Sequence, residues 1–364
     1  MRVAFDHQIF AWQAVGGISR YAWELARHLA SVRGVEPTIV APLYMNRYID
    51  ATGAVAVHGR RIVAIPRAGR LLCALTAPWA RRVLAKVVPD IVHETYYSAA
   101  SSAPKGARSV VTVHDMIHER IGPTSAIVDR TSPLKRQAVS RADHIICVSE
   151  STRRDLIELF RVEPARVSVV HHGCWLPPTM ADDVGASSRP YLLFVGQRGG
   201  YKNFEGLLRA YAAAPVLREN LDVVCFGGGG LRGGERELIR RLGIPAAKVV
   251  QVSGADDVLA MAYRRAALLV YPSRYEGFGM PAVEAMAMGC PVACANTGAL
   301  PEICGDAAEY FDPVETGAIA GAVLRVLETS ERRRLLVARG FERARQFSWR
   351  RCAEKTAGIY ASLL

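Results

Sequence analysis

The sequence predicts an α/β protein made of two Rossmann-like, doubly wound domains, each built on a parallel sheet. Short apolar runs alternate with helical patterns along the whole chain. The alternation restarts at residue 191, after a stretch rich in proline, residues 175–190. The apolar runs contain few polar residues, as is typical of parallel strands that are covered on both faces.

The size and composition of the chain agree with two domains. It has 364 residues, of which 50% are hydrophobic and 22% are charged. We expect an N-terminal domain over residues 1–178, a C-terminal domain over 179–346 and a terminal helix over 347–364. The sequence contains no apolar run long enough for a transmembrane helix. Its eight cysteines show no C-x-x-C spacing, which favours reduced thiols in a cytoplasmic protein.

In the first half, the expected strands are apolar and each leads into a loop. An opening strand is followed by a glycine pair, Gly16 and Gly17, and by a helical pattern through Ala30. A plain turn would also explain the pair, but strand, glycine pair and helix is the layout of a phosphate cradle. The expected strands are residues 2–5, 35–41, 91–95, 109–113, 144–149 and 167–170.

A histidine follows one of these strands directly. His114 and Asp115 come after the apolar run 109–113, and ligands bind at the carboxyl ends of strands in open α/β sheets. We rank His93, which also lies near a strand end, below His114, and His118 lies too far along to share its task. Asp115 could orient the ring of His114 or begin the next turn.

In the second half, we expect strands at 191–195, 221–226, 248–252, 266–270, 291–294 and 310–313, with helices between them. A run of four glycines begins at Gly227, and positions 228, 230 and 233 satisfy G-x-G-x-x-G. This match is weak, because four glycines make it easy and no acidic residue follows at the required distance. We interpret the run as a loop that faces the nucleotide of a donor.

The most informative stretch extends from Tyr271 to Gly289. It reads as a strand end, a loop with two glycines and a helix that begins near Pro281. Free amides at a helix start favour a phosphate. The carboxylates of Glu276 and Glu284 cannot bind phosphate, so we expect them to accept hydrogen bonds from sugar hydroxyls. The alternative is a capped helix in which Glu284 only complements the dipole.

This pattern resembles the signature of the retaining glycosyltransferases of family 4, which have the GT-B fold with two domains facing a central cleft. The resemblance rests on Glu276, seven intervening residues and Glu284, on Gly-Phe-Gly-Met-Pro between them, and on the stretches 284–292 and 300–303. It implies that Glu284 holds the ribose and that Glu276 lies beside the donor sugar. It also implies that the loop amides hold the sugar and the diphosphate, at Gly277, Phe278, Gly279 and Met280.

The resemblance extends to further residues. The loop 196–203 is similar to the second phosphate loop of the family, in which Lys202 matches a cation that clamps the diphosphate. Gln197 occupies the place of the usual arginine, and Arg198 lies one position later. Cations here would stabilise the leaving anion, although exposed cations in a turn are the alternative. The resemblance also implies that Asn203 belongs to the donor-binding residues and that Gly17 lies against the donor phosphate. It further implies that Gly16 lies toward the acceptor and that His114 and Glu276 contact the donor sugar.

Charge suggests a further partner. The net charge is +12, and no acidic residue occurs between Asp50 and Asp90. The same stretch contains Arg60, Arg61, Arg67, Arg70, Arg81, Arg82 and Lys86, among apolar residues and Trp79. An anionic membrane surface suits this composition, and a solvated helix face is the alternative. We do not expect nucleic acid, because aromatic residues are not interleaved with the arginines as stacking platforms.

Together these features predict a retaining hexosyltransferase. The expected donor is a nucleotide-diphosphate sugar. The stretches 5–10 and 16–21 resemble those of enzymes that build bacterial surface polysaccharide, often mannosyltransferases. This resemblance implies GDP-mannose as the favoured donor and a saccharide or lipid-linked saccharide as the acceptor. We expect no cofactor beside the donor and, since no Asp-x-Asp occurs, no metal. The enzyme would work at the inner face of the cytoplasmic membrane. A carboxylate nucleophile is not evident in the sequence. The resemblance to the family implies a same-face attack. A sugar-nucleotide 2-epimerase and a nucleic-acid-binding protein are the alternative functions.

Overall fold

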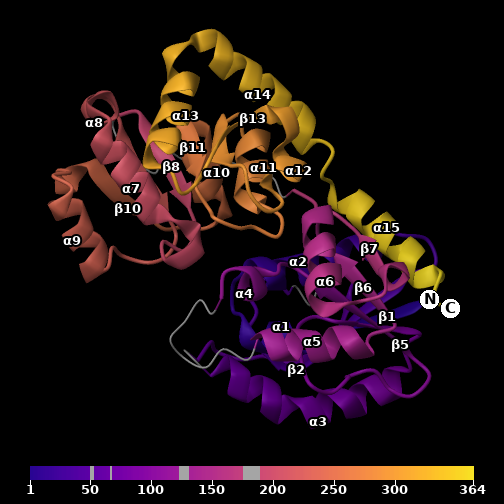
Figure 1. The fold of residues 1–364 in the computed structure, drawn as a ribbon. Coiled ribbons are helices and arrows are strands. Elements are labelled where there is room, and N and C mark those ends of the chain that lie inside the picture. Colours follow the sequence, from indigo (N-terminus) through magenta and orange to yellow (C-terminus); the bar gives the residue numbers. More distant parts are fainter. Residues whose placement is uncertain (50–52, 66–67, 123–130, 175–188) are drawn as a thin grey trace. The chain divides into compact units, whose positions relative to one another are not determined.

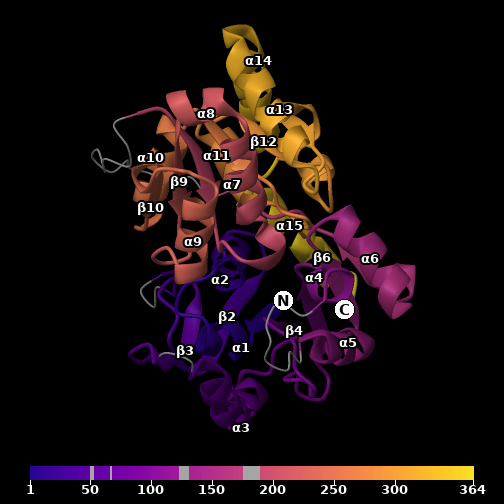
Figure 2. The ribbon, with the colours of Figure 1, turned by 60° about the vertical axis from the view of Figure 1, so that its left-hand side comes forward.

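The computed structural model describes residues 1–49, 53–65, 68–122, 131–174 and 189–364 (Figure 1). It divides into two compact units. Unit 1 contains Met1–Gly173 and Ser348–Leu364, and unit 2 contains Cys174–Phe347. Both chain ends therefore belong to unit 1 (Figures 1 and 2). The domain boundary expected between residues 178 and 179 lies outside the described residues.

Unit 1 is a parallel sheet with helices packed on it. In the described residues its strands are β1 (Arg2–Phe5), β2 (Glu36–Tyr44), β3 (Ala56–Arg61), β4 (Ile91–Glu94), β5 (Arg108–Val113), β6 (His144–Cys147) and β7 (Val167–Val169). They are ordered β3-β2-β1-β4-β5-β6-β7. Its helices are α1 (Gln8–Trp12), α2 (Gly17–Leu29), α3 (Gly69–Val87), α4 (Ile117–Arg120), α5 (Thr131–Arg141), α6 (Glu150–Phe160) and α15 (Trp349–Ala361).

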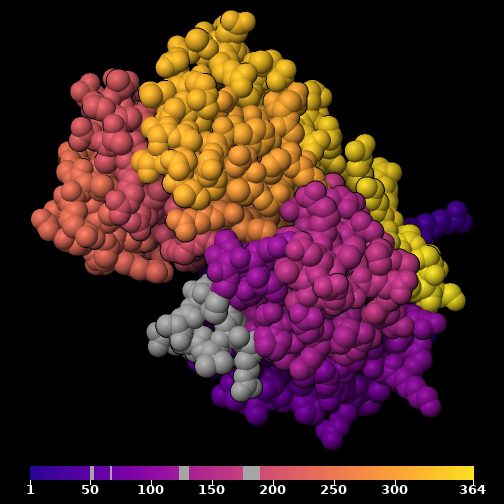
Figure 3. All heavy atoms as spheres, in the orientation of Figure 1, coloured from indigo at the N-terminus to yellow at the C-terminus, as the bar shows by residue number. Residues whose placement is uncertain are grey.

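The last helix, α15, packs on unit 1 although it follows unit 2 in the sequence. Ser348 caps it by accepting a hydrogen bond from the Arg351 amide. Its residues Trp349 and Tyr360 are buried in the core cluster that also contains Tyr21 of α2. Figure 3 shows the yellow atoms of this helix against the magenta atoms of unit 1. Burial of these large rings holds the helix in place.

Unit 2 repeats the arrangement. Its described strands are β8 (Tyr191–Val195), β9 (Asp222–Phe226), β10 (Val249–Val252), β11 (Leu268–Tyr271), β12 (Val292–Ala295) and β13 (Ala308–Phe311), in the order β10-β9-β8-β11-β12-β13. Its helices are α7 (Phe204–Ala213), α8 (Pro215–Asn220), α9 (Gly233–Arg241), α10 (Asp256–Arg265), α11 (Met280–Ala287), α12 (Leu300–Cys304), α13 (Thr316–Glu328) and α14 (Ser330–Ala344).

The expected α/β fold with two doubly wound sheets is confirmed. All strand pairs in both sheets are parallel within the described residues. The strand order reverses between β1 and β4 in unit 1 and between β8 and β11 in unit 2. Such switch points leave a crevice outside the carboxyl ends of the strands, where ligands bind in this class of sheet.

Some expectations about single elements were wrong. The last strand, β13, begins two residues earlier than expected, because its pairing with β12 starts at Ala308. Helix α1 was not expected because it is short, and strand β3 was not expected because it is exposed and polar. Among the described residues, no helix combines the length and the apolar character that crossing a bilayer requires.

Candidate functional site

The centre of the candidate site in unit 2 is an ion pair at the switch point of its sheet. Lys202 Nζ lies 2.7 Å from Glu276 Oε1 and donates a second hydrogen bond to the hydroxyl of Tyr271, at 3.1 Å. Lys202 follows β8 and Glu276 follows β11, which are neighbouring strands. The structure thus brings together two predicted site residues that are 74 positions apart in the sequence.

The surroundings of this pair hold the lysine in place. Its ammonium group lies 5.2 Å from the ring centres of both Tyr201 and Tyr271. Both side chains of the pair are largely buried, with 14% of Lys202 and 9% of Glu276 exposed. A cation held by one carboxylate and two aromatic faces keeps free donor capacity for an anionic ligand.

Arg198 has a different environment from the one expected for a diphosphate clamp. Its guanidinium donates to the carbonyl oxygens of Gly227, Gly229 and Gly230, at 2.7 to 2.9 Å. It also pairs with Glu235, with Nε at 3.1 Å from Oε1. Only 1% of its side chain is exposed. In this conformation the arginine organises the glycine loop and does not join Lys202.

Asn203 also has structural partners. Its backbone has a φ of 57°, a left-handed conformation that asparagine tolerates better than most residues. Its side-chain amide donates to the carbonyl oxygen of Pro313 at 2.8 Å. These two features fix the start of α7, directly after Lys202.

The loop 276–280 leads into α11 through a glycine whose φ is positive. Gly279 is the N-cap of α11 with a φ of 108°, and a Cβ atom there would lie 2.7 Å from Leu300 Cδ2. Only glycine fits such a position. Phe278 is buried with its ring edge against Phe347, at a centroid distance of 5.5 Å. The helix begins at Met280, so its first amides lie immediately after Gly277 to Gly279.

Glu284 lies on α11 and accepts a hydrogen bond from the hydroxyl of Tyr263, at 3.0 Å. Tyr263 belongs to α10 and is fully buried, so it fixes the orientation of the carboxylate. Sequence reasoning did not select Tyr263, Tyr271 or Glu235. Only Tyr271 carried a signal in the sequence, because it ends a buried strand next to the loop.

In unit 1, His114 follows β5 as expected and lies among aromatic rings. Its ring packs edge-on against Tyr21 at 5.0 Å and is stacked with His172 at 5.8 Å. Burial, with the neighbouring His93 and Lys135, lowers the pKa of His114 to about 3. The imidazole is therefore neutral at physiological pH and can both donate and accept a hydrogen bond.

The residues next to His114 have structural tasks. Asp115 begins the next turn, because its Oδ1 accepts from the Ile117 amide at 3.1 Å. His93 is buried, bonded to Tyr360 through Nδ1 and to Thr112 through Nε2 at 2.8 Å. Burial lowers the pKa of His93 to about 4. These contacts agree with the lower rank that the sequence gave to His93.

The glycine pair begins α2. Gly16 is the N-cap of this helix, and a Cβ atom there would lie 2.3 Å from Gln13 Oε1. Gly17 is the first helical residue, and no atom lies within 4 Å of where its Cβ would be. The backbone at Gly17 is thus open to close approach by a ligand. Within the described ranges, no three His, Cys, Asp or Glu side chains converge on a position that could hold a metal ion.

The comparison with family models covers both halves of the chain. Residues 15–174 match the model described as Glycosyltransferase Family 4, and residues 180–343 match the model described as Glycosyl transferases group 1. The O-antigen chain mannosyltransferase B of Escherichia coli is 30% identical over 379 residues, which cover 95% of this chain and 96% of that protein.

Solved structures share the fold at lower identity. Sucrose-phosphate synthase from Thermosynechococcus elongatus has a TM-score of 0.77 at 21% identity and covers 100% of this chain and 98% of its own. Anabaena HepE, solved in complex with UDP-glucose, has a TM-score of 0.74 at 16% identity and covers 100% of both chains. The chain therefore belongs to the glycosyltransferases defined by these two family models, and its fold is GT-B.

Proposed function

We propose that this glycosyltransferase moves a hexosyl group, with mannose favoured, from a nucleotide-diphosphate sugar to a saccharide or lipid-linked saccharide of bacterial surface polysaccharide. The relation to an O-antigen chain mannosyltransferase along nearly the whole of both proteins supports the choice of sugar and acceptor class. The complex of HepE with UDP-glucose supports a nucleotide sugar as donor, and GDP-mannose remains our preferred donor.

The observation that carries the proposal is the contact of Lys202 with Glu276 at the switch point of unit 2. In the proposed complex, the ammonium group and the first amides of α11 bind the diphosphate. Glu284 accepts hydrogen bonds from the ribose hydroxyls. Glu276 and the neutral imidazole of His114 position the hydroxyls of the donor sugar.

The proposed transfer retains the configuration of the anomeric carbon. The acceptor oxygen bonds to this carbon on the face from which the nucleoside diphosphate departs. The bond between the anomeric carbon and the phosphate oxygen breaks, and the acceptor proton passes to that oxygen. Lys202 offsets the negative charge that develops on the leaving group, which is the largest electrostatic demand of the step. Arg198 contributes indirectly, because it holds the loop 227–230 that we assign to the nucleotide side.

A screen of nucleotide sugars by thermal shift tests the proposal, because a bound donor raises the melting temperature by mass action. We expect GDP-mannose to give the largest shift and Glu284→Ala to weaken its binding about tenfold by calorimetry, which corresponds to one charged hydrogen bond. Glu205→Ala, an exposed carboxylate on α7, is the matched control. No shift with any nucleotide sugar would refute the proposal. Consumption of the donor without an acceptor, giving an epimerised nucleotide sugar, would favour the epimerase.

We also propose that α3 holds the enzyme on an anionic membrane surface. Leu71, Leu75 and Trp79 are 63%, 69% and 50% exposed. Successive helical residues are rotated by about 100°, so these three share one face with Arg82 and Lys86. Apolar side chains interspersed with cations suit a bilayer of acidic lipids.

Sedimentation with phosphatidylglycerol vesicles tests this membrane contact. Each cation near such a surface contributes about 1 kcal/mol, so Arg82→Ala combined with Lys86→Ala should weaken binding about thirtyfold. High salt should have a similar effect, because it screens exposed charges. Replacing two exposed arginines of unit 2, Arg240 and Arg241, is the control. If the parent protein stays in the supernatant at low salt, the membrane proposal is wrong.

A further inference from the structure

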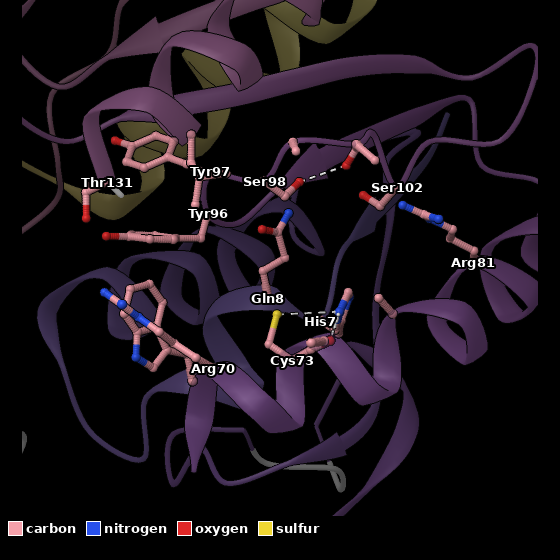
Figure 4. A pocket seen from close by; sticks show the side chains of 16 residues that line it. His7, Gln8, Arg70, Cys73, Arg81, Tyr96, Tyr97, Ser98, Ser102 and Thr131 are labelled. Atoms are coloured by element: carbon pink, nitrogen blue, oxygen red, sulfur yellow. Dashed lines mark hydrogen bonds between the residues drawn. The ribbon is translucent and has the colours of Figure 1, made fainter. Parts of the chain in front are cut away.

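Unit 1 contains a cavity of about 450 Å³ that the assigned site does not use (Figure 4). His7 and Gln8, which follow β1, and Tyr96 and Tyr97, which follow β4, line it together with α3 and the start of α5. These two strands flank the switch point of the sheet, where ligands bind in this fold class. The volume is that of a small-molecule site.

Most of the lining is apolar. Ala74 and Ala77 of α3 and Ala99 and Ala100 of the loop after β4 contribute only methyl groups, which leaves room for a chain-like ligand. At one end, Trp12 packs edge-on against Tyr96 with ring centres 4.6 Å apart. A flexible apolar chain that lies along such a surface gains free energy by leaving water.

The floor of the cavity is polar, and hydrogen bonds within the protein hold its side chains in place before a ligand binds. The buried carboxylate of Asp6 accepts hydrogen bonds from Gln8 Nε2 at 2.7 Å and from Ser102 Oγ at 2.8 Å. The amide nitrogen of Gln8 donates to Asp6, so its carbonyl oxygen faces away from Asp6. Figure 4 shows this side chain pointing from α1 toward the loop that carries Ser98 and Ser102. It offers a ligand a rigid hydrogen-bond acceptor.

Two cations stand at the ends of the cavity. Figure 4 shows Arg70 and Arg81 at opposite ends, and the guanidinium of Arg70 lies 5.2 Å from the ring centre of Trp12. Within the described parts of the chain, neither arginine forms an ion pair with a carboxylate. The absence of acidic residues from this stretch of sequence explains why. An anion could therefore bind at either end.

The cavity also lies next to the exposed face of α3. Arg70, Ala74, Ala77 and Arg81 fall on one side of the helix, and the stripe of Leu71, Leu75 and Trp79 falls on the side next to it. A molecule anchored in the surface on which the stripe rests could reach the cavity by passing around a single helix.

We propose that this cavity binds the carrier end of the acceptor, an isoprenoid phosphate whose apolar chain lies along the alanines and whose phosphate meets Arg70 or Arg81. The inference rests on the proposed function, because it supplies the lipid-linked acceptor for the transfer. It adds a binding site in unit 1 to the donor residues of unit 2.

Calorimetry of the full chain with farnesyl phosphate, in the absence of vesicles, tests the inference. Ala74→Trp should fill the cavity and abolish binding, whereas Ala85→Trp, which is also exposed on α3 but lies outside the lining, should bind like the parent protein. Loss of the arginine that meets the phosphate should weaken binding about tenfold, so we expect this effect in Arg70→Ala or Arg81→Ala. Arg154→Ala, exposed on α6, is the control for loss of one positive charge.

Binding of related compounds shows which parts of the ligand the cavity recognises. Farnesol and inorganic phosphate should each bind at least tenfold more weakly than farnesyl phosphate. Unchanged binding in Ala74→Trp and in both arginine variants would overturn the assignment. Equal binding of dihexanoyl phosphatidylglycerol, lost in Ala74→Trp, would overturn it in favour of a lipid headgroup site. Nucleotide-sugar binding measured on the same samples separates the two proposals. If the parent protein bound farnesyl phosphate but no nucleotide sugar, the proposed function alone would be refuted.

Discussion

Two histidines near the carboxyl end of the unit 1 sheet are neutral, whereas two basic side chains near the carboxyl end of the unit 2 sheet are charged and paired. In unit 2, the groups at the strand ends are charged and paired, as in Lys202 with Glu276 and Arg198 with Glu235. In unit 1, His93 lies in β4 and His114 follows β5, and burial lowers their pKa values to about 4 and about 3. Burial penalises a charge that has no partner, so an isolated imidazole becomes neutral whereas a paired cation does not.

This difference matches two kinds of ligand chemistry. A diphosphate carries negative charge and is stabilised by cations and helix amides, which unit 2 offers around Lys202 and at the start of α11. Hydroxyl groups are neutral and need partners that both donate and accept, which a neutral imidazole provides. We infer that the carboxyl end of each sheet is adapted to a different part of the substrates.

The largest expected effect is on the charged side of the comparison. Lys202→Ala should reduce the transfer rate about 10²- to 10³-fold, as removal of one electrostatic stabiliser of a leaving group does. The measurement is the steady-state rate of sugar transfer at saturating donor. Arg209→Ala, an exposed cation of α7 paired with Glu205, is the matched control and should keep the parent rate.

Lys202→Ala also leaves Glu276 without its partner, so the variant's melting temperature must be measured as well. The double variant Lys202→Ala with Glu276→Gln removes the unpaired carboxylate and separates the two effects. A parent rate in the single variant would show that unit 2 does not use this cation, and the comparison between the units would lose its functional meaning.

Substitution of Arg198 tests whether every buried cation of unit 2 binds the ligand. Its guanidinium is saturated by loop carbonyls and Glu235, so Arg198→Met should lower the free energy of unfolding by about 3 kcal/mol. Urea denaturation measures this value. Arg209→Met, which breaks only an exposed pair, should change it by less than about 0.5 kcal/mol. A variant of parent stability that fails to bind the donor would instead assign Arg198 to the diphosphate, as the sequence suggested.

The sequence could predict those parts of the fold and site that depend on local pattern. Strand β8 has the expected bounds, Tyr191–Val195, because a buried parallel strand is a continuous apolar run. The five-residue helix α1 is shorter than two helical turns, so it produced no periodic pattern. The proposed donor set was selected through the family resemblance of loops that carry glycines and charges at fixed spacing, and it stays a prediction.

The partners of these residues were beyond sequence reasoning, because they come from distant positions. Glu235 lies 37 positions from Arg198, and Tyr360 lies 267 positions from His93. Only the packing of the sheet and of α15 brings such groups together. For the same reason, the sequence could place Arg198 near the diphosphate loop but could not reveal that the carbonyls of residues 227–230 would hold its guanidinium.

The smallest expected effect concerns the neutral histidines of unit 1. The pKa of His114 is about 3 in the folded chain and close to 6.5 in an unfolded one, so the unfolded chain binds the extra proton first. The stability that this neutral imidazole contributes is therefore complete above pH 6.5 and is lost as the pH falls toward 3. In this window the slope is about 1.4 kcal/mol per pH unit for each such histidine.

The free energy of unfolding should fall between pH 6 and pH 5. We expect this fall to be about 1 kcal/mol smaller in His114→Gln than in the parent protein. Urea denaturation at the two pH values gives the difference, and other groups that titrate in both proteins cancel from it. His58→Gln, on the exposed strand β3, is the control for the chemistry of the substitution. Equal pH dependence in His114→Gln and the parent would mean that His114 is protonated in the folded state, and the contrast between a neutral and a charged sheet edge would then not hold at this residue.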